Sequence, residues 1–599
     1  MDYPALNKLF LDAVDRYANP KAQMYKTANG WESISAGEML RRVAGLSKAL
    51  GELGIRTGDR VGIFAPNCAE WHVADFAITG LGAASVPIYF NESADRLTYI
   101  LNDSGARIVI TKGESQARKI AEARERMPGL EHVISVAPPS DLHGEILRYE
   151  TLIATAGDAD IAEYRRRSAE VSGSLLATII YTSGTTGEPK GVMLNHSNLS
   201  SNSIDSLKEY VFEPGDVALE FLPLAHVYER TVGYGYLSRG VSIAYLEQIE
   251  TVAEALLEVH PTMTAAVPRF FEKLYANILE KGHRETGLKR KIFDWALGVA
   301  QESVPWRAYG KKPSGGLQLR WGIADRLVFS KIRTGLGGKI RTFCSGGAPL
   351  APELAEFFWS LDVRVFQGYG LTETAPVVTA NLPTANKVGT VGRPIPHVQV
   401  RIAEDGEILV KGPNVMQGYY RKPAETREVL TEDGWFRTGD IGKLDSDGYL
   451  IITDRKKELL KTSGGKMIAP QPIESKLSNS PLVACAAVVG DRHKFLSVLI
   501  APAFPALETL AQQRGIAFAS RAELVNDPWV QAEYQTLVHQ VNEKLANFET
   551  IKRFHLVTEE WSMESGEFTP TMKLKRRVVA ERYAQQIASI YHDEATAQR

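Results

Sequence analysis

Hydrophobic positions in the first 140 residues follow two alternating periods. Short runs of β-branched and other apolar residues at 60–64, 84–89, 107–110 and 132–136 have the length and composition of buried strands. Between these runs, apolar positions recur every three or four residues at 35–53, 68–80, 97–102 and 116–126, which indicates helices. Strands that alternate with helices predict an α/β fold with doubly wound, mostly parallel sheets.

The same pattern continues along the rest of the chain with two interruptions. Residues 141–171 are polar and poorly periodic, and we expect them to form a connector. Strands are expected at 175–181, 192–194, 340–344 and 363–366, with a helix from Pro352. Residues 268–331 predict a long helical region, and residues 471–599 alternate strands and helices a second time. The second alternation predicts a smaller α+β domain at the C-terminus.

Composition narrows the class of protein. A chain of 599 residues exceeds one hydrophobic core, so at least two domains are expected. The net charge of -2 gives no indication of a nucleic-acid partner. Three scattered cysteines predict neither a disulfide framework nor a metal site, which favours a reducing, cytoplasmic location. The N-terminus lacks the features of a signal peptide, and no apolar run approaches the ~18 residues of a membrane span. Any membrane contact would be peripheral.

A polar loop between two predicted strands is the strongest chemical signal. Residues 181–191 read Tyr-Thr-Ser-Gly-Thr-Thr-Gly-Glu-Pro-Lys-Gly, with three glycines, four hydroxyl groups besides the tyrosine, and Lys190. Glycines allow close approach of the backbone to an anion, hydroxyl and amide groups donate hydrogen bonds, and the lysine supplies charge. The loop departs from the Walker A pattern, in which the lysine precedes Ser or Thr at a helix start. A flexible surface turn is the alternative interpretation of this composition.

Further polar segments follow later strands. Residues 221–230 place His226 in an apolar stretch, where a packed histidine is the commoner role. Residues 345–350 and 367–374 each join a strand to a glycine turn, and residues 435–442 contain a Thr-Gly-Asp turn. Residues 451–461 and 569–577 carry clusters of charge that are also typical of exposed hairpins and tails. Residues 462–466 read Thr-Ser-Gly-Gly-Lys.

In this order, the segments resemble the motifs of the adenylate-forming (AMP-binding) enzymes, which include acyl-CoA synthetases, luciferases and peptide-synthetase adenylation domains. The resemblance covers nearly the whole chain and implies binding of ATP and Mg²⁺, with Glu373 as the metal ligand. A glutamate suits this role because Mg²⁺ binds one or two carboxylates together with substrate phosphates. The implied ATP- and AMP-binding residues are Thr182, Ser183, Gly184, Thr185, Thr186, Gly187, Gly346, Gly347, Ala348, Gln367, Gly368, Tyr369, Gly370, Thr372, Asp440, Ile452 and Arg455.

The resemblance also implies a catalytic set and a moving domain. The implied catalytic residues are Lys573, Glu373, Lys190 and His226. His226 would act as a gate beside the reacting carboxylate. Asp454 would be the hinge between a large domain, residues 1–454, and a small mobile domain, residues 455–599. Lys461, Gly464 and Gly465 would line the tunnel for the pantetheine arm of coenzyme A. Relatives often have glycine where this chain has Met572, which leaves Lys575 as a competitor of Lys573.

Two features favour a long-chain fatty acid as the substrate. Peptide-synthetase domains usually hold the substrate amino group with an aspartate, and residues 221–246 contain none. The helical insertion at about 283–332 resembles the insertion of long-chain fatty acyl-CoA synthetases. The expected reaction forms an acyl-adenylate from a long-chain fatty acid and ATP, and then transfers the acyl group to coenzyme A. Chain-length preference and a homodimer are left open.

Three alternatives remain at this point. The acyl-adenylate can go to an acyl carrier protein, or another carboxylic acid can be the substrate. A third alternative is a membrane-associated binding protein on an inactive synthetase fold, which the retained lysines, acids and arginine disfavour. The insertion also predicts contact with anionic lipid on the inner face of a membrane, although a solvated basic face has the same composition. The residues concerned are Lys289, Arg290, Lys291, Arg307, Lys311, Lys312, Arg320, Trp295, Trp306 and Trp321.

Overall fold

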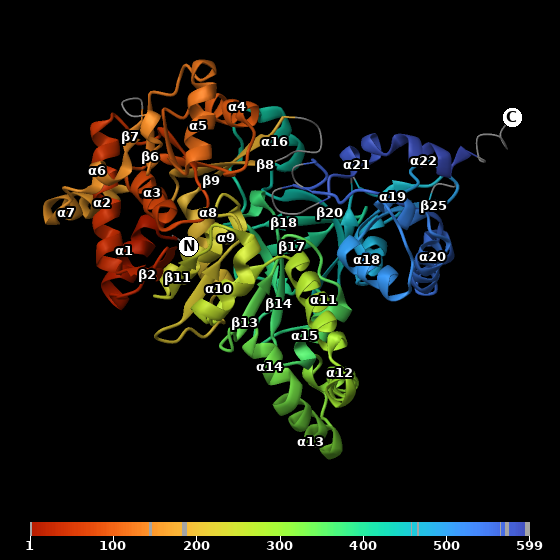
Figure 1. Ribbon diagram of the computed structural model, residues 1–599. Coiled ribbons are helices and arrows are strands. Elements are labelled where there is room, and N and C mark those ends of the chain that lie inside the picture. The colour runs from red at the N-terminus through yellow and green to blue at the C-terminus, as the bar shows by residue number, and fades with distance from the viewer. Residues whose placement is uncertain are drawn as a thin grey trace.

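A large N-terminal part with three sheets and a small C-terminal part make up the structure (Figure 1). The small part, coloured blue, lies beside β18 (Glu407–Lys411) and β20 (Phe436–Leu444), and a group of helices projects from the large part. The computed structural model describes residues 3–142, 146–182, 188–456, 458–463, 466–562, 565–569 and 574–592.

The first sheet contains eight short strands and confirms the predicted α/β class. In spatial order they are β19 (Gly418–Tyr419), β9 (Lys190–Asn195), β8 (Leu176–Thr182), β4 (Ala84–Ile88), β3 (Arg60–Phe64), β5 (Ile108–Lys112), β6 (His132–Val136) and β7 (Leu147–Arg148). Neighbours from β8 to β7 are parallel, whereas β8, β9 and β19 are antiparallel.

Helices cover both faces of this sheet, as a doubly wound fold requires. One face packs against α4 (Ala94–Ser104) and α5 (Glu114–Ala123), and the other against α2 (Ala36–Glu52) and α3 (Ala69–Gly80). The apolar period of α2 buries Met39, Leu40, Val43, Leu46 and Leu50. Its start is set by Ser35, whose hydroxyl oxygen accepts a hydrogen bond from the Glu38 N–H at 3.1 Å. The predicted helix over residues 35–53 is confirmed.

The second sheet has nine strands, and its central strands are parallel. In spatial order they are β16 (Arg393–Pro394), β15 (Val377–Ala380), β14 (Val365–Gly370), β13 (Thr342–Ser345), β12 (Met263–Ala266), β10 (Val217–Glu220), β11 (Ser242–Tyr245), β1 (Gln23–Thr27) and β2 (Gly30–Ile34). The loops that follow β10 to β14 therefore leave the sheet at the same edge.

Helices line this second sheet and join it to the first. They are α1 (Leu6–Tyr17), α8 (His196–Ser206), α9 (Val227–Ser238), α10 (Val252–Val259), α11 (Pro268–Arg284) and α15 (Pro352–Ser360). Of these, α8 contacts β9 of the first sheet and β15 of the second. One hydrophobic core consequently runs through both sheets.

Three smaller sheets lie in the C-terminal third of the chain. The third sheet orders β17 (Gln399–Ile402), β18, β20 and β21 (Leu450–Arg455), with α16 (Pro423–Val429) beside it. The small part contains β24 (Val483–Val489), β25 (Leu496–Pro502) and β26 (Ile551–Leu556), and a hairpin of β22 (Leu460–Lys461) and β23 (Met467–Ile468). Its helices are α17 (Pro470–Ser478), α18 (Phe504–Gln513), α19 (Arg521–Asn526), α20 (Pro528–Asn542), α21 (Arg576–Arg582) and α22 (Ala584–Ile590).

The segment 141–171, expected to be a connector, is largely helical, which its weak periodicity did not indicate. This segment contains two helices, α6 (Tyr149–Ile153) and α7 (Asp158–Glu170). Only Tyr164 and Ser168 of α7 are buried, so its apolar period is too weak to detect. The Tyr164 hydroxyl donates to the Phe76 carbonyl at 2.9 Å, and ion pairs such as Arg166–Glu170 at 2.6 Å stabilise the exposed face.

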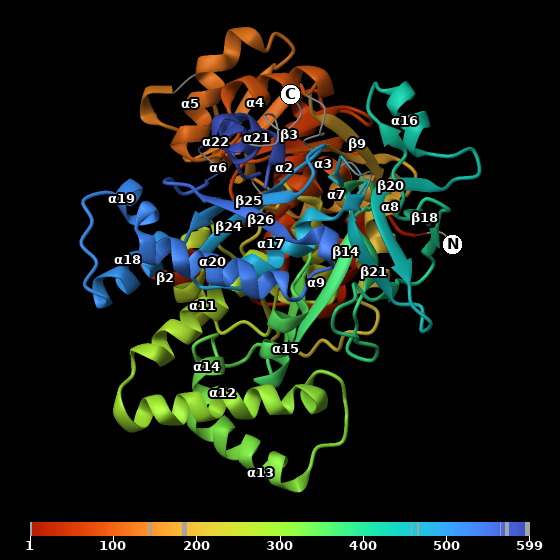
Figure 2. The same ribbon diagram turned by 90° about the vertical axis from the view of Figure 1, so that its right-hand side faces the viewer.

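The helical region expected after residue 267 is confirmed. It consists of α11, α12 (Gly287–Arg307), α13 (Gly315–Ala324), a π-helical turn at Asp325–Phe329 and α14 (Ser330–Thr334). Figure 2 shows α12, α13 and α14 extending away from the sheets. None of the helices in the described part of the chain is long and apolar enough for a membrane span.

A buried ion pair joins the two large sheets. The Arg230 guanidinium on α9 is fully buried and donates to the Asp75 carboxylate on α3 at 2.5 Å. It also donates to hydroxyl oxygens of Ser85 on β4 and Thr178 on β8, at 2.7 and 2.8 Å. Tyr234 completes the set as a partner of both charged groups. Through these bonds, a helix that packs on β10 and β11 is fixed to the first sheet.

Breaking this ion pair should destabilise the large part strongly. Arg230→Met leaves the Asp75 carboxylate buried without its partner, and a loss of about 3–5 kcal/mol in unfolding free energy is expected. Urea unfolding followed by tryptophan fluorescence measures the change. The control Arg166→Met removes exposed ion pairs on α7 and should change stability by less than about 1 kcal/mol. The double variant Arg230→Met, Asp75→Leu should recover part of the loss; equal stability of Arg230→Met and wild type would contradict this account.

Candidate active site

The phosphate-loop candidate is the turn between two antiparallel strands. Thr182 at the end of β8 pairs with Lys190 at the start of β9. Ser183, Gly184, Thr185, Thr186 and Gly187 lie outside the described residues. The loop returns beside α4, where the Tyr99 hydroxyl donates to the Pro189 carbonyl at 3.2 Å. The two described ends of the loop are therefore fixed by the sheet and by α4.

Tyr419 connects two predicted catalytic residues. Its hydroxyl donates to Glu373 Oε1 at 2.9 Å, and the Lys190 ammonium lies 5.1 Å from the centre of its ring. Burial raises the pKa of Tyr419, and the neighbouring Glu373 carboxylate raises it further. The contact arises because β19 pairs with β9 and places Tyr419 opposite Val192. Sequence reasoning missed Tyr419, because nothing in the local run Gly-Tyr-Tyr indicates this long-range pairing.

Asp440 lies at the centre of a second cluster. The Tyr369 hydroxyl donates to Asp440 Oδ2 at 2.6 Å, and Arg455 Nε lies 3.4 Å from Asp440 Oδ1. Burial and the adjacent Asp440 raise the pKa of Tyr369 well above its usual range. Asp440 and Arg455 stand opposite each other in the pairing of β20 with β21. The structure thus brings three predicted nucleotide residues together from two sheets.

The Thr-Gly-Asp segment predicted as a turn lies within strand β20, and two neighbouring side chains hold its backbone. The Asp440 N–H donates to Thr438 Oγ1 at 3.0 Å, and the Gly439 N–H donates to Glu407 Oε1 at 3.0 Å. Glu407 is buried on β18 and was absent from the predicted set. The predicted residue Ile452 packs on the same hydrophobic cluster as Tyr369.

The glycines that follow β13 and β14 occupy crowded positions. A Cβ at Gly346 would lie 2.9 Å from the ring of Tyr228, and one at Gly370 would lie 1.9 Å from the Pro376 carbonyl oxygen. Gly347 has φ +82°, in the left-handed region that favours glycine. Ala348 follows in the same turn, and Gln367 pairs with Ser345 across the two strands, followed by Gly368. Thr372 and Glu373 start the short 3₁₀ turn after β14.

His226 caps the helix that faces these glycines. Its Nδ1 accepts a hydrogen bond from the Tyr228 N–H at 3.1 Å, at the N-terminus of α9. The Tyr228 hydroxyl donates to the Cys344 carbonyl at 3.0 Å, and its ring lies against Gly346. The structure therefore brings the start of α9, with His226, to the same sheet edge as the Gly346 turn.

A buried polar cluster formed by residues of β10, α9 and α3 was also missed. Glu220 and Glu229 are almost fully buried, and their carboxyl oxygens have no hydrogen-bond partner among the described residues. Burial raises the pKa of both carboxyl groups well above their usual range, and burial lowers the pKa of His72 to about 4. A Cβ at Gly233 would lie within 3.1 Å of Glu220 Oε1 and His72 Nε2. Burial thus favours the neutral form of all three groups.

The hinge candidate, Asp454, lies close to Arg576 of the C-terminal segment. Asp454 is buried at the end of β21, and burial raises its pKa to about 6. Arg576 lowers that pKa, whereas Glu458 and Glu474 raise it. Arg576 itself donates to Glu474 Oε2 at 2.5 Å and lies 3.4 Å from Glu458. A charge network therefore ties the start of α21 to the segment after β21.

The predicted adenylation lysine, Lys573, lies outside the described residues, as do Gly464 and Gly465. Its flanking residues Phe568 and Leu574 form an isolated bridge. The competitor Lys575 donates its N–H to the Glu567 carbonyl at 2.7 Å, and its charge lowers the otherwise raised pKa of Glu92, which precedes α4. The C-terminal segment thus faces the helix that contacts the phosphate loop. Lys461 lies on β22, where its N–H donates to Asp491 at 3.0 Å.

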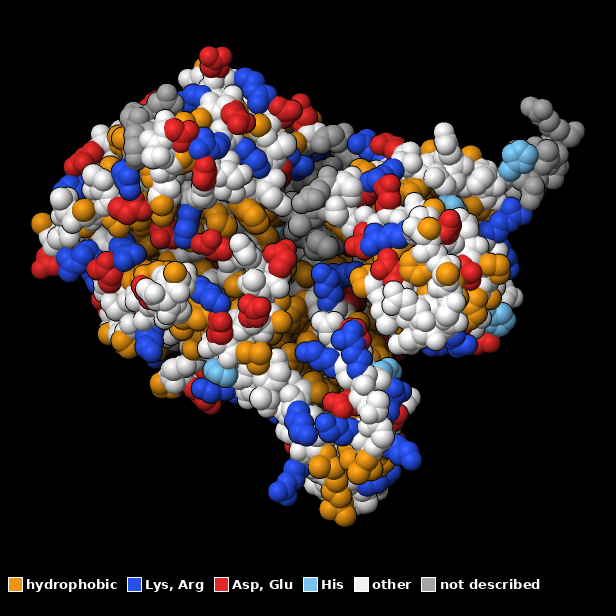
Figure 3. All heavy atoms as spheres, in the orientation of Figure 1, with side chains coloured by type: hydrophobic (Ala, Val, Ile, Leu, Met, Phe, Trp, Pro, Cys, Tyr) orange, Lys and Arg blue, Asp and Glu red, His pale blue; other side chains and the backbone are white. Residues whose placement is uncertain are grey.

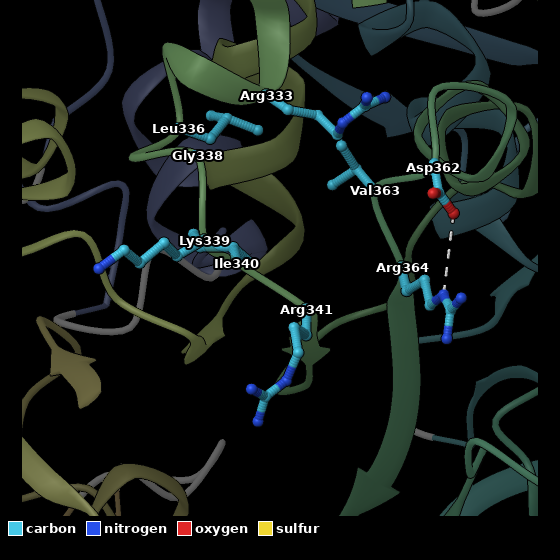
Figure 4. A pocket seen from close by; sticks show the side chains of 9 residues that line it. All are labelled: Arg333, Leu336, Gly338, Lys339, Ile340, Arg341, Asp362, Val363 and Arg364. Carbon is cyan, nitrogen blue, oxygen red and sulfur yellow. Dashed lines mark ion pairs between the residues drawn. The ribbon is translucent and has the colours of Figure 1, made fainter. Parts of the chain in front are cut away.

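A basic cavity elsewhere in the fold does not coincide with these residues. It has a volume of about 300 Å³ and lies before the N-terminal ends of β13 and β14. The nucleotide candidates follow the opposite ends of the same strands. Figure 4 shows that the side chains of Lys339, Arg341 and Arg364 diverge, and Arg364 lies 3.8 Å from Asp362. Divergent cations do not form a cradle for a polyphosphate.

Comparisons with known proteins match the whole chain. A model of AMP-binding enzymes matches residues 10–420, and a model of the AMP-binding enzyme C-terminal domain matches residues 457–595. The long-chain-fatty-acid–CoA ligase FadD15 of Mycobacterium tuberculosis is 38% identical over 94% of this chain and 93% of its own length. The long-chain-fatty-acid–CoA ligase ACSBG2 of Xenopus laevis is 31% identical over 99% of this chain and 84% of its own length. The adenylation domain of a carboxylate reductase from Mycobacterium chelonae has the same fold, with a TM-score of 0.75, 22% identity and coverage of 98% and 91%.

The Asp440 cluster generates a test of nucleotide binding. Asp440→Ala should weaken ATP binding about tenfold or more, because it removes a charged hydrogen-bond acceptor from the site. Tyr369→Phe keeps the ring but removes the O–H that orients the carboxylate, and a loss of about two- to fivefold is expected. Isothermal titration measures both.

The matched control is Asp445→Ala. Asp445 directly follows β20, at the start of the turn that leads to β21. Its carboxylate pairs with Lys387 at 2.7 Å and not with Tyr369. It should leave ATP affinity within about twofold of wild type. Unchanged ATP affinity in Asp440→Ala would show that the cluster is structural.

Proposed function

The chain belongs to the AMP-binding enzyme family, and from that premise we propose that it is a long-chain fatty acid–CoA ligase. It would join a long-chain fatty acid to coenzyme A with conversion of ATP to AMP and pyrophosphate. The observation that carries the proposal is the identity of at least 30% with long-chain-fatty-acid–CoA ligases over almost the whole chain. The contacts of Lys190 and Glu373 with Tyr419, and of Arg455 with Asp440, support an intact site.

In the first step, a carboxylate oxygen of the fatty acid attacks the α-phosphorus of ATP. The bond from that phosphorus to the bridging oxygen breaks, and pyrophosphate leaves with its electron pair. The protein contributes position and charge more than covalent chemistry. Lys190 and the phosphate loop would hold the phosphates, while Asp440, Tyr369 and Arg455 would hold the nucleoside. His226, at the N-terminus of α9, would face the reacting carboxylate.

Glu373 fits the role of a Mg²⁺ ligand. Tyr419 donates to one of its oxygens, which fixes the carboxylate beside Lys190. The described residues contain no group of three or more His, Cys, Asp or Glu side chains arranged for a metal ion. The ion would consequently be shared with the phosphates of ATP, as is usual for Mg²⁺. When bound, it neutralises part of the phosphate charge.

The second step requires a different arrangement of the small domain. The coenzyme A thiol loses its proton to solvent, and its sulfur attacks the acyl carbonyl carbon. The bond from that carbon to the phosphate oxygen breaks, and AMP leaves with the electron pair. Residues 1–454 and 455–599 would rotate relative to each other at Asp454. No hydrophobic cluster of the described residues contains members from both sides of residues 453–459, which supports a hinge there. Rotation would withdraw Lys573 and bring Lys461, Gly464 and Gly465 to the site.

The same assay distinguishes three other assignments. An enzyme that loads an acyl carrier protein would activate the acid without using free coenzyme A. An enzyme for another carboxylic acid would remain silent with long-chain substrates. An inactive fold would consume no ATP with any acid.

The test is AMP release from ATP and Mg²⁺ with palmitate, with and without coenzyme A. The proposal predicts rapid AMP release only when palmitate and coenzyme A are both present. Pyrophosphate exchange with palmitate but no turnover with coenzyme A would favour carrier loading. No exchange and no AMP release with palmitate would overturn the proposal.

The Glu373 assignment predicts a change in metal requirement. Glu373→Gln should raise the Mg²⁺ concentration for half-maximal pyrophosphate exchange about tenfold or more, because a neutral amide is a poor ligand for Mg²⁺. Tyr419→Phe should cause a smaller rise, since the carboxylate remains but loses the hydroxyl that orients it. The rates are measured over a Mg²⁺ series at saturating palmitate.

Glu428→Gln provides the control, because this glutamate is exposed on α16. It should match wild type at every Mg²⁺ concentration. A normal Mg²⁺ profile in Glu373→Gln would remove Glu373 from the metal site.

A further inference from the structure

One helix, α4, contacts both described ends of the phosphate loop that joins β8 to β9. It packs on the first sheet through Leu97, Ile100 and Leu101. Ser93 caps its N-terminus, and Gly105, with φ +65°, ends it. Figure 3 shows charged side chains of both signs on the outer surface around α4 and α5, so the apolar side of α4 is the side that faces the sheet. The helix is therefore fixed to the sheet independently of the loop.

Tyr181 anchors the strand that enters the loop. Its hydroxyl donates to Asp103 Oδ2 on α4 at 2.6 Å. Tyr181 stands opposite Gly191 of β9, where a Cβ would lie 3.2 Å from Cζ of the Tyr181 ring. Glycine at position 191 thus leaves room for the ring on its way to α4. Burial raises the pKa of Tyr181, and Asp103 raises it further, which favours the protonated form that donates the hydrogen bond.

Tyr99 anchors the strand that leaves the loop. Its hydroxyl donates to the carbonyl of the buried Pro189 at 3.2 Å, directly before β9. Its ring packs edge-on against Tyr181, with 6.2 Å between the ring centres. Tyr99 and Asp103 are four residues apart on α4, so they lie on the same side of the helix. One side of α4 consequently contacts the chain before the loop and the chain after it.

The anchor and the first residue of the loop motif point to opposite faces of the sheet. Side chains alternate along a strand, so Tyr181 and Thr182 have opposite directions. Tyr181 belongs to the hydrophobic cluster between the sheet and α4. Thr182 pairs with Lys190 across the two strands, at the point where the loop begins and ends. The position of Tyr181 on α4 therefore sets the position of Thr182 and Lys190.

We propose that Tyr181 and Asp103 are positioning residues for the phosphates of ATP, with Tyr99 as a weaker third member. They hold the two ends of the loop in register, so that Lys190 meets the phosphates that leave as pyrophosphate. A loop that is anchored at both ends loses less conformational entropy when it binds these phosphates, and the anchors thereby increase the affinity for ATP. The adenosine and the phosphate that remain as AMP depend instead on the Asp440 cluster, which comes from other sheets.

This inference rests on the proposed role of the loop in ATP binding, and not on the identity of the acid or of the acyl acceptor. Nucleotide binding is measured without palmitate and without coenzyme A. A failure of the ligase assignment and a failure of the inference therefore remain separate results.

The experiment is isothermal titration of the full chain with ATP and with AMP, each in the presence of Mg²⁺. Tyr181→Phe keeps the ring but removes the donor, and Asp103→Ala removes the acceptor. Each should weaken ATP binding about fivefold or more and leave AMP binding within about twofold of wild type. Asp103→Asn retains an acceptor oxygen and should recover most of the ATP affinity. Tyr99→Phe should weaken ATP binding about twofold, because its bond is longer and its acceptor is uncharged.

The two main residues should act as one pair. The double variant Tyr181→Phe, Asp103→Ala should lose no more ATP affinity than the weaker-binding single variant, because both substitutions remove the same hydrogen bond. Losses that multiply in the double variant would contradict a shared role.

Tyr3→Phe is the matched control. Tyr3 is a buried tyrosine outside the candidate site, and its hydroxyl donates to Asp205 at 2.6 Å, the same distance as in the Tyr181–Asp103 pair. This variant should bind both nucleotides within about twofold of wild type, and thermal unfolding verifies that every variant folds. Unchanged ATP affinity in Tyr181→Phe and Asp103→Ala would overturn the proposal. Equal losses of ATP and AMP affinity would also overturn it, because the bond would then support the site as a whole and not the phosphate loop.

Discussion

The Arg230–Asp75 ion pair is the interaction on which the geometry of the site depends. A guanidinium without water must find an acceptor for each donor, and Arg230 finds them on α3, β4 and β8. This requirement fixes the rotation and height of α9 against the first sheet. His226 and Tyr228 at the start of the same helix consequently meet the Gly346 turn of the second sheet. One buried charge thus sets the distance between residues that come from two sheets.

The arrangement of charges matches a site that binds a polyphosphate and then releases part of it. Lys190 and Glu373 are linked through Tyr419, and Asp440 is linked to Tyr369 and Arg455. Apart from Arg455, which adjoins the hinge, these groups are fixed in the large domain, whereas Lys573 and the Lys461 hairpin belong to the small one. In the proposed mechanism, the fixed groups serve both steps and the small domain exchanges one face for another. The charged contacts of Arg576 with Glu458 and Glu474 lie beside the proposed hinge, where rotation would begin.

Local patterns in the sequence predicted most elements but few of the contacts between them. Strands such as β3 and β6 and the helix α2 have strong periods and were found in place. The helix α7 was missed because it buries only two side chains and is otherwise stabilised by surface ion pairs. Tyr419 and Glu407 were missed for another reason: their roles depend on strand pairing, which no local pattern encodes. The roles of Thr182, Glu373 and Asp440 came from the resemblance to a family, because each turn taken alone is common.

The most direct measurement of the two-state mechanism separates the half-reactions in Lys573→Ala and Lys575→Ala. Pyrophosphate exchange with palmitate reports the first step, and thioester formation from supplied palmitoyl-adenylate and coenzyme A reports the second. The account predicts that Lys573→Ala loses exchange by at least about a hundredfold while it retains thioester formation, because a positioned charge is lost only from the first transition state. Lys575→Ala should retain both steps. Equal loss of the two half-reactions in Lys573→Ala would contradict a small domain that presents different residues to each step.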